Sequence, residues 1–332
     1  MTTNKTALVL GATGGIGGAI ATALGRHGWT VRAMVRDPAK AAAGWKGGGR
    51  MPTWITGDAM IRADIVAAAE GVDAIVHAVN PPGYRNWDRM VLPMMANTIA
   101  AAEAAGGARV VLPGTIYNFD PEQLAVIDAD SPQMPRTRKG AIRVRMERML
   151  QDAAPAVSSL VVRAGDFFGP GSRSSWFSQS LVKPDQPVRR LLNPAIGAGH
   201  SWAYLPDLAE AIVRLMDAGD RLDVFERVQF EGYCDTSGAG MVGAVRRAIG
   251  RDVPERAFPW WLMRMLAPFG GFPREVVEIE PYWRHPVRFD NRRLIALIGE
   301  EPRTPFDTAI ATTLAALDCL DRPANAPAQQ AA

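Results

Sequence analysis

The glycine-rich segment between Lys5 and Ile20 constrains the fold of this chain more than any other stretch. The apolar run Ala7–Leu10 precedes Gly11-Ala12-Thr13-Gly14-Gly15-Ile16-Gly17-Gly18, and a run of helical character follows. This order predicts a strand, a tight turn and a helix. Glycines permit positive φ and close approach of a ligand to the backbone, while unpaired N–H groups at the helix start can bind phosphate. With a second strand expected at residues 29–35, the segment predicts a dinucleotide-binding βαβ unit.

The turn at residues 11–17 resembles the nucleotide-binding turn of the short-chain dehydrogenase/reductase superfamily, specifically its extended and atypical, epimerase/dehydratase-like branches. Further segments resemble that superfamily in the same order and carry the resemblance to about Ala218: Gly57-Asp58, His77–Asn80, Pro113–Tyr117, Arg163–Gly171 and His200–Asp207. The resemblance implies an α/β fold, with a Rossmann-type doubly wound parallel sheet and a smaller, mainly helical C-terminal substrate lobe. It also implies that an NAD(P) cofactor contacts Gly11, Thr13, Gly14, Gly15, Ile16, Gly17, Asp58, Ala78, Val79, Asn80 and Arg163.

Length and composition are consistent with one compact unit. The chain has 332 residues, of which 48% are apolar and 21% are charged, the balance of a globular protein with a sizeable core. We expect an NAD(P)-binding core at residues 1–165, a substrate lobe at 166–321 interleaved with that core, and a disordered tail at 322–332. Within the lobe we expect, among others, one helix over residues 274–283. Four predicted interactions remain to be considered: nucleic acid, metal, membrane and a second subunit.

The net charge is only +3 and the basic residues are dispersed among acids, which argues against nucleic-acid binding. Cys234 and Cys319 lie far apart without metal-ligand spacing, so we expect reduced thiols and no metal site. No signal peptide precedes the first strand and no uncharged apolar run reaches eighteen residues, so we expect a cytoplasmic protein without a membrane span. The apolar stripe of the helix expected at 87–105 predicts either core packing or a homodimer face. Trp260 and Trp261 predict a packed helix, a membrane contact or a cover over an apolar substrate.

The end of the second strand bears on the choice of cofactor. An acid at this position binds the ribose 2′-hydroxyl of NAD, whereas a nearby Arg suits the 2′-phosphate of NADP. Val35 occupies the place of the acid, Arg36 follows it, and Arg32 lies on the same strand face. The sequence therefore favours NADP over NAD, with two ordinary solvated arginines as the alternative.

The helix after the fifth strand departs from the superfamily pattern. There a Tyr and a Lys four residues apart face the nicotinamide, but alignment through Glu147-Arg148-Met149-Leu150 places Lys139 and Arg143 at those positions. Arg143 cannot titrate, so we expect it to hold ribose hydroxyls or a substrate carboxylate. A second cation one turn away should lower the pKa of Lys139, which makes Lys139 a candidate general acid. The alternative is that both are solvated surface charges.

Other groups could contribute to the same chemistry. Thr115 resembles the family Ser/Thr that hydrogen-bonds the substrate oxygen, Tyr117 is a substitute acid or a core residue, and Asp166 is expected to cap a loop. The sequence therefore predicts an NADP-dependent oxidoreductase for a small or moderately apolar carbonyl or hydroxyl compound. A cofactor-retaining epimerase or dehydratase and a non-catalytic NADPH sensor are the alternatives.

Overall fold

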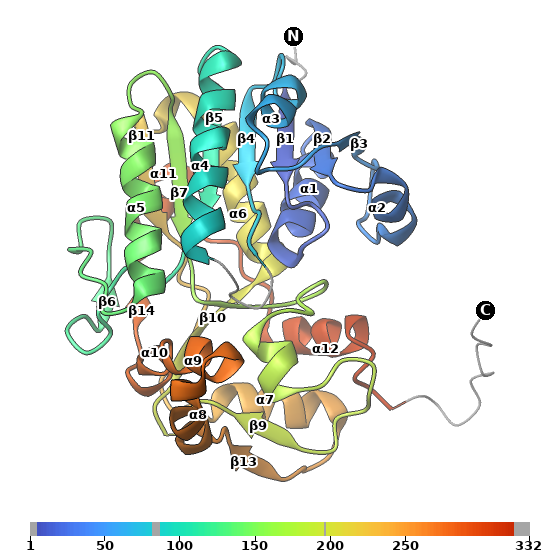
Figure 1. Ribbon diagram of the computed structural model, residues 1–332. Helices are drawn as coiled ribbons and strands as arrows, with labels where there is room; N and C mark the ends of the chain where they lie inside the picture. The colour runs from blue at the N-terminus through green and yellow to red at the C-terminus, as the bar shows by residue number, and fades with distance from the viewer. Residues whose placement is uncertain (1–4, 82–86, 196, 322–332) are drawn as a thin grey trace.

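The computed structural model describes residues 5–81, 87–195 and 197–321. A seven-stranded parallel sheet forms the centre of one lobe, with the strand order β11-β7-β5-β4-β1-β2-β3 (Figure 1). The strands are β1 (Thr6–Leu10), β2 (Thr30–Val35), β3 (Thr53–Thr56), β4 (Ala74–His77), β5 (Arg109–Pro113), β7 (Ser159–Arg163) and β11 (Phe225–Gln229). The order reverses between β1 and β4, which is the arrangement of a doubly wound sheet. The fold class predicted from the sequence is confirmed.

Helices cover both faces of this sheet, which explains why the interiors of its central strands are apolar on both faces. One face carries α1 (Gly15–Arg26), α6 (Leu205–Asp217) and α11 (Arg292–Ile298). The other carries α3 (Arg62–Ala68), α4 (Trp87–Ala104) and α5 (Arg138–Asp152). A further short helix, α2 (Pro38–Gly44), contacts β3.

The apolar stripe of α4 belongs to the core. Trp87, Val91, Met95 and Ala102 are buried in the same cluster as the apolar side chains of the central strands. Of the two interpretations drawn from the sequence, core packing therefore describes these residues.

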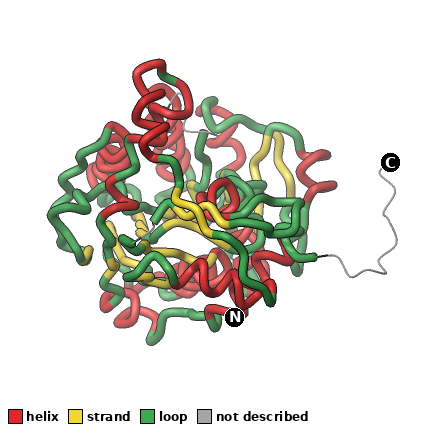
Figure 2. Tube along the Cα trace, turned by 90° about the horizontal axis from the view of Figure 1, so that it is seen from below, coloured by secondary structure: helices red, strands yellow, loops and turns green. Residues whose placement is uncertain are grey.

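The second lobe faces the carboxyl ends of the sheet strands, in the lower half of Figure 1. Its strands form three small sheets: β8 (Asp166–Phe168) with β10 (His200–Tyr204) and β12 (Tyr233–Asp235), β9 (Leu191–Asn193) with β13 (Glu255–Ala257), and β6 (Val126–Ile127) with β14 (Arg288–Phe289). Its helices are α7 (Gly240–Ile249), α8 (Trp260–Leu266), α9 (Gly271–Val277), α10 (Pro281–Arg284) and α12 (Phe306–Ala316), with short π or 3₁₀ segments at Phe177–Leu181 and Ala267–Phe269. A 3₁₀ segment at Gly219–Arg221 joins α6 to β11 in the sheet lobe. An aromatic-rich cluster that includes Phe177, Trp202 and Trp283 forms the core of the second lobe. Figure 2 shows the strands enclosed by helices and loops.

Segments 166–321 serve both lobes. The strand β11 extends the main sheet beside β7, and α6 and α11 pack on one of its faces. The single helix expected at 274–283 is instead two helices, α9 and α10, because Pro281 begins α10 and lacks the N–H that a continuous helix would need. The tail at 322–332 lies outside the described residues.

The two tryptophans of α8 have different environments. Trp260 is 7% exposed and donates its indole N–H to the Pro194 carbonyl, whereas Trp261 is 64% exposed. The packing expected from the sequence therefore holds for Trp260 but not for Trp261. None of the described helices has the length and apolar character needed to cross a bilayer.

A buried ion-pair cluster joins the two lobes. Lys139, in the first turn of α5, is completely buried, and its ammonium contacts Glu275 Oε2 at 2.5 Å and Glu278 Oε2 at 2.6 Å. Its backbone N–H donates to Glu278 Oε1 at 2.7 Å. Glu275 is in α9 and Glu278 follows that helix. Lys139 therefore fastens a helix of the sheet lobe to the second lobe.

We expect Lys139→Met to lower the free energy of unfolding by roughly 3–5 kcal/mol, because it leaves two carboxylates without their buried counter-ion. Urea unfolding measures this change. Arg138→Met is the matched control: Arg138 contacts the same Glu275 but its side chain is 44% exposed, so its loss should cost about 1 kcal/mol or less. Equal effects of the two substitutions on the free energy of unfolding would contradict a structural role for the buried Lys139 ion pairs.

Candidate functional site

The glycine turn lies at the carboxyl end of β1, where the strand order reverses. Gly11 has φ +86°, and a Cβ there would lie 2.5 Å from the Ala78 carbonyl oxygen after β4. A Cβ on Gly17 would lie 2.2 Å from the Gly11 carbonyl oxygen. The Gly14 N–H donates to that same oxygen at 2.9 Å. These contacts require glycine at positions 11 and 17 and hold the N-terminus of α1 close against β1 and β4.

Thr13 and Gly14 are exposed at the top of this turn. Gly14 caps α1 with extended backbone (φ −88°, ψ 168°) and without a side-chain hydrogen bond. The N–H groups of the first helical turn can therefore bind an anion such as a pyrophosphate. This is the arrangement predicted from the sequence for Gly11, Gly14, Gly15 and Gly17, and their contact with a cofactor stays a prediction.

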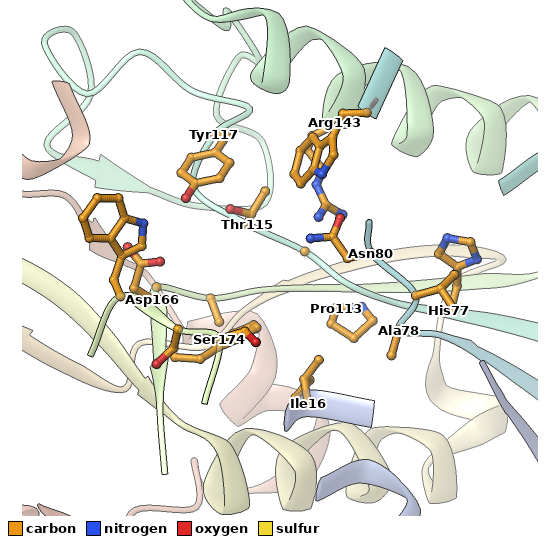
Figure 3. Close-up of a pocket in the computed structure, with 18 residues that line it drawn as sticks. Ile16, His77, Ala78, Asn80, Pro113, Thr115, Tyr117, Arg143, Asp166 and Ser174 are labelled. Carbon is orange, nitrogen blue, oxygen red and sulfur yellow. The ribbon is translucent and has the colours of Figure 1, made fainter. Parts of the chain in front are cut away.

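A pocket opens beside the turn and brings together several residues predicted from the sequence (Figure 3). The predicted residues that line it are Ile16, Ala78, Val79, Asn80, Thr115, Tyr117 and Arg143. In Figure 3, Arg143 and Asn80 lie on the side of His77, whereas Thr115 and Tyr117 lie on the side of Asp166. The pocket thus has one wall from the main sheet and α5, and another from the segments that follow β5 and β7.

Arg143 is the residue of α5 that reaches the pocket. Its guanidinium lies 4.9 Å from the centre of the Trp87 ring, and its Nη1 contacts the Met146 sulfur at 3.8 Å. A cation held in this way can bind hydroxyl or carboxylate oxygens without itself exchanging a proton. The position agrees with the positioning role expected from the sequence.

Lys139 and Arg163 do not line this pocket. Lys139 lies in the interlobe cluster, where two carboxylates rather than another cation contact its ammonium, and its role as general acid stays a sequence-based prediction. Arg163 is completely buried, and its Nη2 contacts Glu147 Oε2 at 2.6 Å. It lies over the ring of Phe119 at 5.0 Å and ties β7 to α5. These contacts favour a structural role for both residues.

Arg36 and Asp58 lie at the ends of β2 and β3, apart from the residues that line the pocket. Arg36 is exposed, whereas Arg32 donates from Nη1 to the Glu70 carbonyl at 2.6 Å. Asp58 lies ahead of α3, and its Oδ1 accepts the Met60 N–H at 2.9 Å. Of Arg32 and Arg36, only Arg36 is therefore an exposed cation at the end of β2.

His77 is a pocket residue that the sequence marked only as part of a turn. It is buried, and its Nδ1 lies 2.8 Å from Thr98 Oγ1. Because the Thr98 hydroxyl donates to the Met94 carbonyl, the proton of this contact belongs to Nδ1. Nε2 is then an acceptor, and it has no hydrogen-bond partner within the described residues. Burial, and next the charge of Arg143, lower the pKa of His77 to about 3.

The remaining wall comes from residues after β7. Asp166 does not cap a loop as expected but begins β8, and its carboxylate contacts His200 at 2.7 Å. Ser174, Ser175 and Trp176 also line the pocket. No local pattern in the sequence marked Ser174 and Ser175, because their position depends on the path of the chain between β8 and the π-helical segment.

Comparisons with known proteins agree with this geometry. Residues 11–152 match a family model described as NAD(P)H-binding. A 3-diazoavenalumate denitrifying reductase from a Streptomyces species is 29% identical over 182 residues, which are 50% of this chain and 57% of that protein. The chain thus spans little more than half the length of this curated relative.

Solved structures share the fold over nearly the whole chain. MoeE5 in complex with UDP-glucose and NAD aligns with a TM-score of 0.69 and 18% identity, over 94% of this chain and 98% of that one. A UDP-glucose 4-epimerase from Bifidobacterium longum, in complex with NAD+ and UDP, aligns with a TM-score of 0.69 and 14% identity, over 93% and 97%. The NAD(P)-binding domain and the fold predicted from the sequence are therefore confirmed.

Two substitutions in the turn should separate ligand binding from folding. Gly14→Val should abolish dinucleotide binding in a folded protein, because the added side chain would occupy the exposed space at the turn where the pyrophosphate is expected to bind. Its Cβ would lie 3.3 Å from the Gly11 carbonyl oxygen. Gly17→Val should instead destabilise the fold by about 1–3 kcal/mol or more, because of the 2.2 Å approach. Titration with NADPH, followed by tryptophan fluorescence, and urea unfolding measure the two effects. Unchanged affinity in folded Gly14→Val would contradict the phosphate-binding interpretation.

The pKa of His77 predicts a pH dependence of stability. Between the ordinary value of 6.5 and about 3, the unfolded chain takes up a proton at His77 that the folded chain does not. Stability from this group is therefore complete above pH 6.5 and falls with decreasing pH, by up to ~1.4 kcal/mol per pH unit. Unfolding experiments at pH 7.5 and 5.5 should show a larger loss for the wild type than for His77→Gln. His285→Gln, at an exposed site, should keep the wild-type pH dependence.

Proposed function

We propose that this protein is an NADP-dependent oxidoreductase, because residues 11–152 match a family model described as NAD(P)H-binding and the chain shares its fold with MoeE5 in complex with NAD. Its substrate would be a small or moderately apolar carbonyl or hydroxyl compound. The observation that carries the proposal is the pocket beside the glycine turn. Ile16, from the first turn of α1, lines the same pocket as Arg143, Thr115 and Tyr117, so a group bound at the turn can extend toward these side chains.

The residues present suit a dinucleotide. The turn offers a cradle that a Cβ at Gly11 or Gly17 would fill, and the start of α1 offers N–H donors. We assign the pyrophosphate to the turn, the 2′-phosphate to Arg36, the adenine to Asp58 and the ribose of the nicotinamide to Arg143. Bound NADPH would supply a hydride. Thr115 and Tyr117 would orient the substrate oxygen through their hydroxyl groups.

The composition of the pocket supports the substrate class. Trp87, Phe167 and Trp176 give it apolar walls, while Thr115 and Ser174 contribute hydroxyl groups. Such a mixture favours a compound with an apolar body and one or two oxygen functions. The similarity to a 3-diazoavenalumate denitrifying reductase supports a reductase.

Two other functions have an observation in their favour. A cofactor-retaining epimerase or dehydratase is favoured by the shared fold with a UDP-glucose 4-epimerase. A non-catalytic NADPH sensor is favoured by α5, which contains no tyrosine and directs Lys139 into the interlobe cluster.

One experiment distinguishes the three. The purified protein is incubated with NADPH and a panel of carbonyl compounds, and cofactor absorbance, cofactor binding and substrate isomerisation are followed together. An oxidoreductase consumes NADPH in proportion to product, an epimerase changes substrate without net consumption, and a sensor binds NADPH without either change.

We expect NADPH to bind at least about tenfold more tightly than NADH, a difference of about 1.4 kcal/mol. Val35 offers no carboxylate to a ribose hydroxyl, and exposed Arg36 can pair with the 2′-phosphate. Arg36→Ala should weaken NADPH binding and leave NADH binding nearly unchanged, as measured by fluorescence titration. Arg32→Ala, on the same strand but bound to the Glu70 carbonyl, is the matched control and should keep the ratio. Equal affinities of the wild type for both dinucleotides would contradict NADP preference.

A further inference from the structure

We infer that Asp166 and His200 share one transferable proton in the wall of the pocket, and that this pair exchanges the proton with the substrate oxygen. The inference rests on the proposed oxidoreductase function for its chemical role. The Asp166–His200 pair would supply the proton donor that α5, which has no tyrosine, does not contribute to the pocket.

The two residues lie on neighbouring strands of one small sheet. Asp166 begins β8 and His200 begins β10, and these strands pair in parallel, with Trp202 opposite Asp166. His200 Nε2 lies 2.7 Å from Asp166 Oδ2. The side chain of Asp166 is 17% exposed and lines the pocket, whereas that of His200 is 2% exposed. Asp166 therefore faces the pocket, and His200 lies behind it.

Counting donors and acceptors places a proton between the two side chains. His200 Nδ1 lies 3.2 Å from the Tyr282 carbonyl oxygen, which can only accept, so Nδ1 carries a hydrogen. A neutral imidazole with this hydrogen has a bare Nε2, which cannot donate to a carboxylate. The 2.7 Å contact is then a hydrogen bond only if a proton lies on Nε2 or on Asp166 Oδ2. Either arrangement leaves the pair with zero net charge and one proton to give.

The surroundings hold His200 in this orientation. Its ring stacks on Trp283, with centroids 3.6 Å apart and planes 11° apart, and meets the edge of Trp202 at 5.1 Å. The π face of Trp283 can accommodate an imidazolium as well as a neutral ring. A rotated imidazole would lose the stack and the contact with the Tyr282 carbonyl together.

Neighbouring titratable groups have other contacts. The Tyr282 hydroxyl donates to the carbonyls of Tyr117 and Phe119, and burial raises its pKa to about 12. Asp235, opposite His200 on β12, accepts the N–H groups of Ser237, Gly238 and Met241. Tyr117 lines the pocket and is therefore tested separately.

In the direction of reduction, a bound reduced dinucleotide would supply the hydride that the carbonyl carbon gains, and the π-bond pair would move to the oxygen. A new O–H bond forms there as the Asp166 carboxyl group loses the shared proton. The pair is left as a carboxylate and a neutral imidazole protonated on Nδ1, and it regains a proton from solvent. Oxidation reverses each transfer.

The proton can be observed without any turnover. The chain has four histidines, so ¹⁵N-histidine labelling gives a small set of ring-nitrogen signals. The two signals that disappear in His200→Gln belong to Nδ1 and Nε2 of His200. In the protein without added cofactor we expect Nδ1 to be protonated near pH 7. We also expect either a second proton on Nε2 or, in ¹³C-aspartate-labelled protein, the carboxyl carbon shift of a protonated Asp166. A neutral His200 protonated only on Nε2 would overturn the inference.

Turnover tests the chemical role. Asp166→Asn preserves shape but cannot transfer a proton, so it should lower kcat by roughly 10² to 10⁴, with NADPH affinity and KM within a few-fold. His200→Gln should lower kcat in the same direction. Tyr117→Phe, which removes the hydroxyl assigned to orienting the substrate oxygen, should raise KM. His285→Gln, at an exposed site outside the pocket, should keep the wild-type kcat. Wild-type kcat in Asp166→Asn would overturn the inference. Failure of the wild type to bind NADPH would instead overturn the proposed function, while the NMR result still decides whether the pair shares a proton.

Discussion

The site depends on two close backbone approaches at the glycine turn. Gly17 leaves room for the Gly11 carbonyl, and Gly11 leaves room for the Ala78 carbonyl. Any Cβ at either position would push α1 away from β1 or β1 away from β4. With both present, the N-terminus of α1 lies at the point where strand order reverses, which is where open α/β sheets bind ligands. The pocket then needs only a wall from the opposite side.

That wall is supplied by the second lobe and held by buried charge. Lys139 of α5 binds Glu275 and Glu278, and Arg163 of β7 binds Glu147 of α5. Neither Lys139 nor Arg163 lines the pocket. Lys139 connects α5 to the second lobe, and Arg163 connects β7 to α5. Without these cations, the carboxylates that they bind would have no counter-charge. Arg143, one turn along from Lys139, is the cation left to line the pocket among these three. One helix therefore fastens the lobes with its first turn and contributes to the site with its second.

Much of the fold could be predicted from local patterns. The apolar runs at β1, β4 and β7 are buried on both faces, and the glycine spacing marks the turn that follows β1. The helix expected at 87–105 corresponds to α4 (Trp87–Ala104). The break between α9 and α10 depends on Pro281, which has no backbone N–H to donate within a continuous helix. The positions of Arg143, Thr115, Tyr117 and Asn80 in one pocket followed from the family resemblance rather than from spacing.

The sequence by itself determined the dinucleotide-binding βαβ unit, because glycine requirements and strand periodicity act over a few neighbouring residues. Through its resemblance to the superfamily, the sequence also predicted that Lys139 and Arg143 of α5 stand where that superfamily has a Tyr and a Lys. Only the tertiary structure decided which of these charges meets the pocket, since the carboxylates that bind Lys139 lie 136 and 139 residues further along the chain. It likewise brought His200 to Asp166 across 34 residues. Such pairings depend on how β8, β10 and α9 pack against the sheet lobe, and no local propensity encodes that packing.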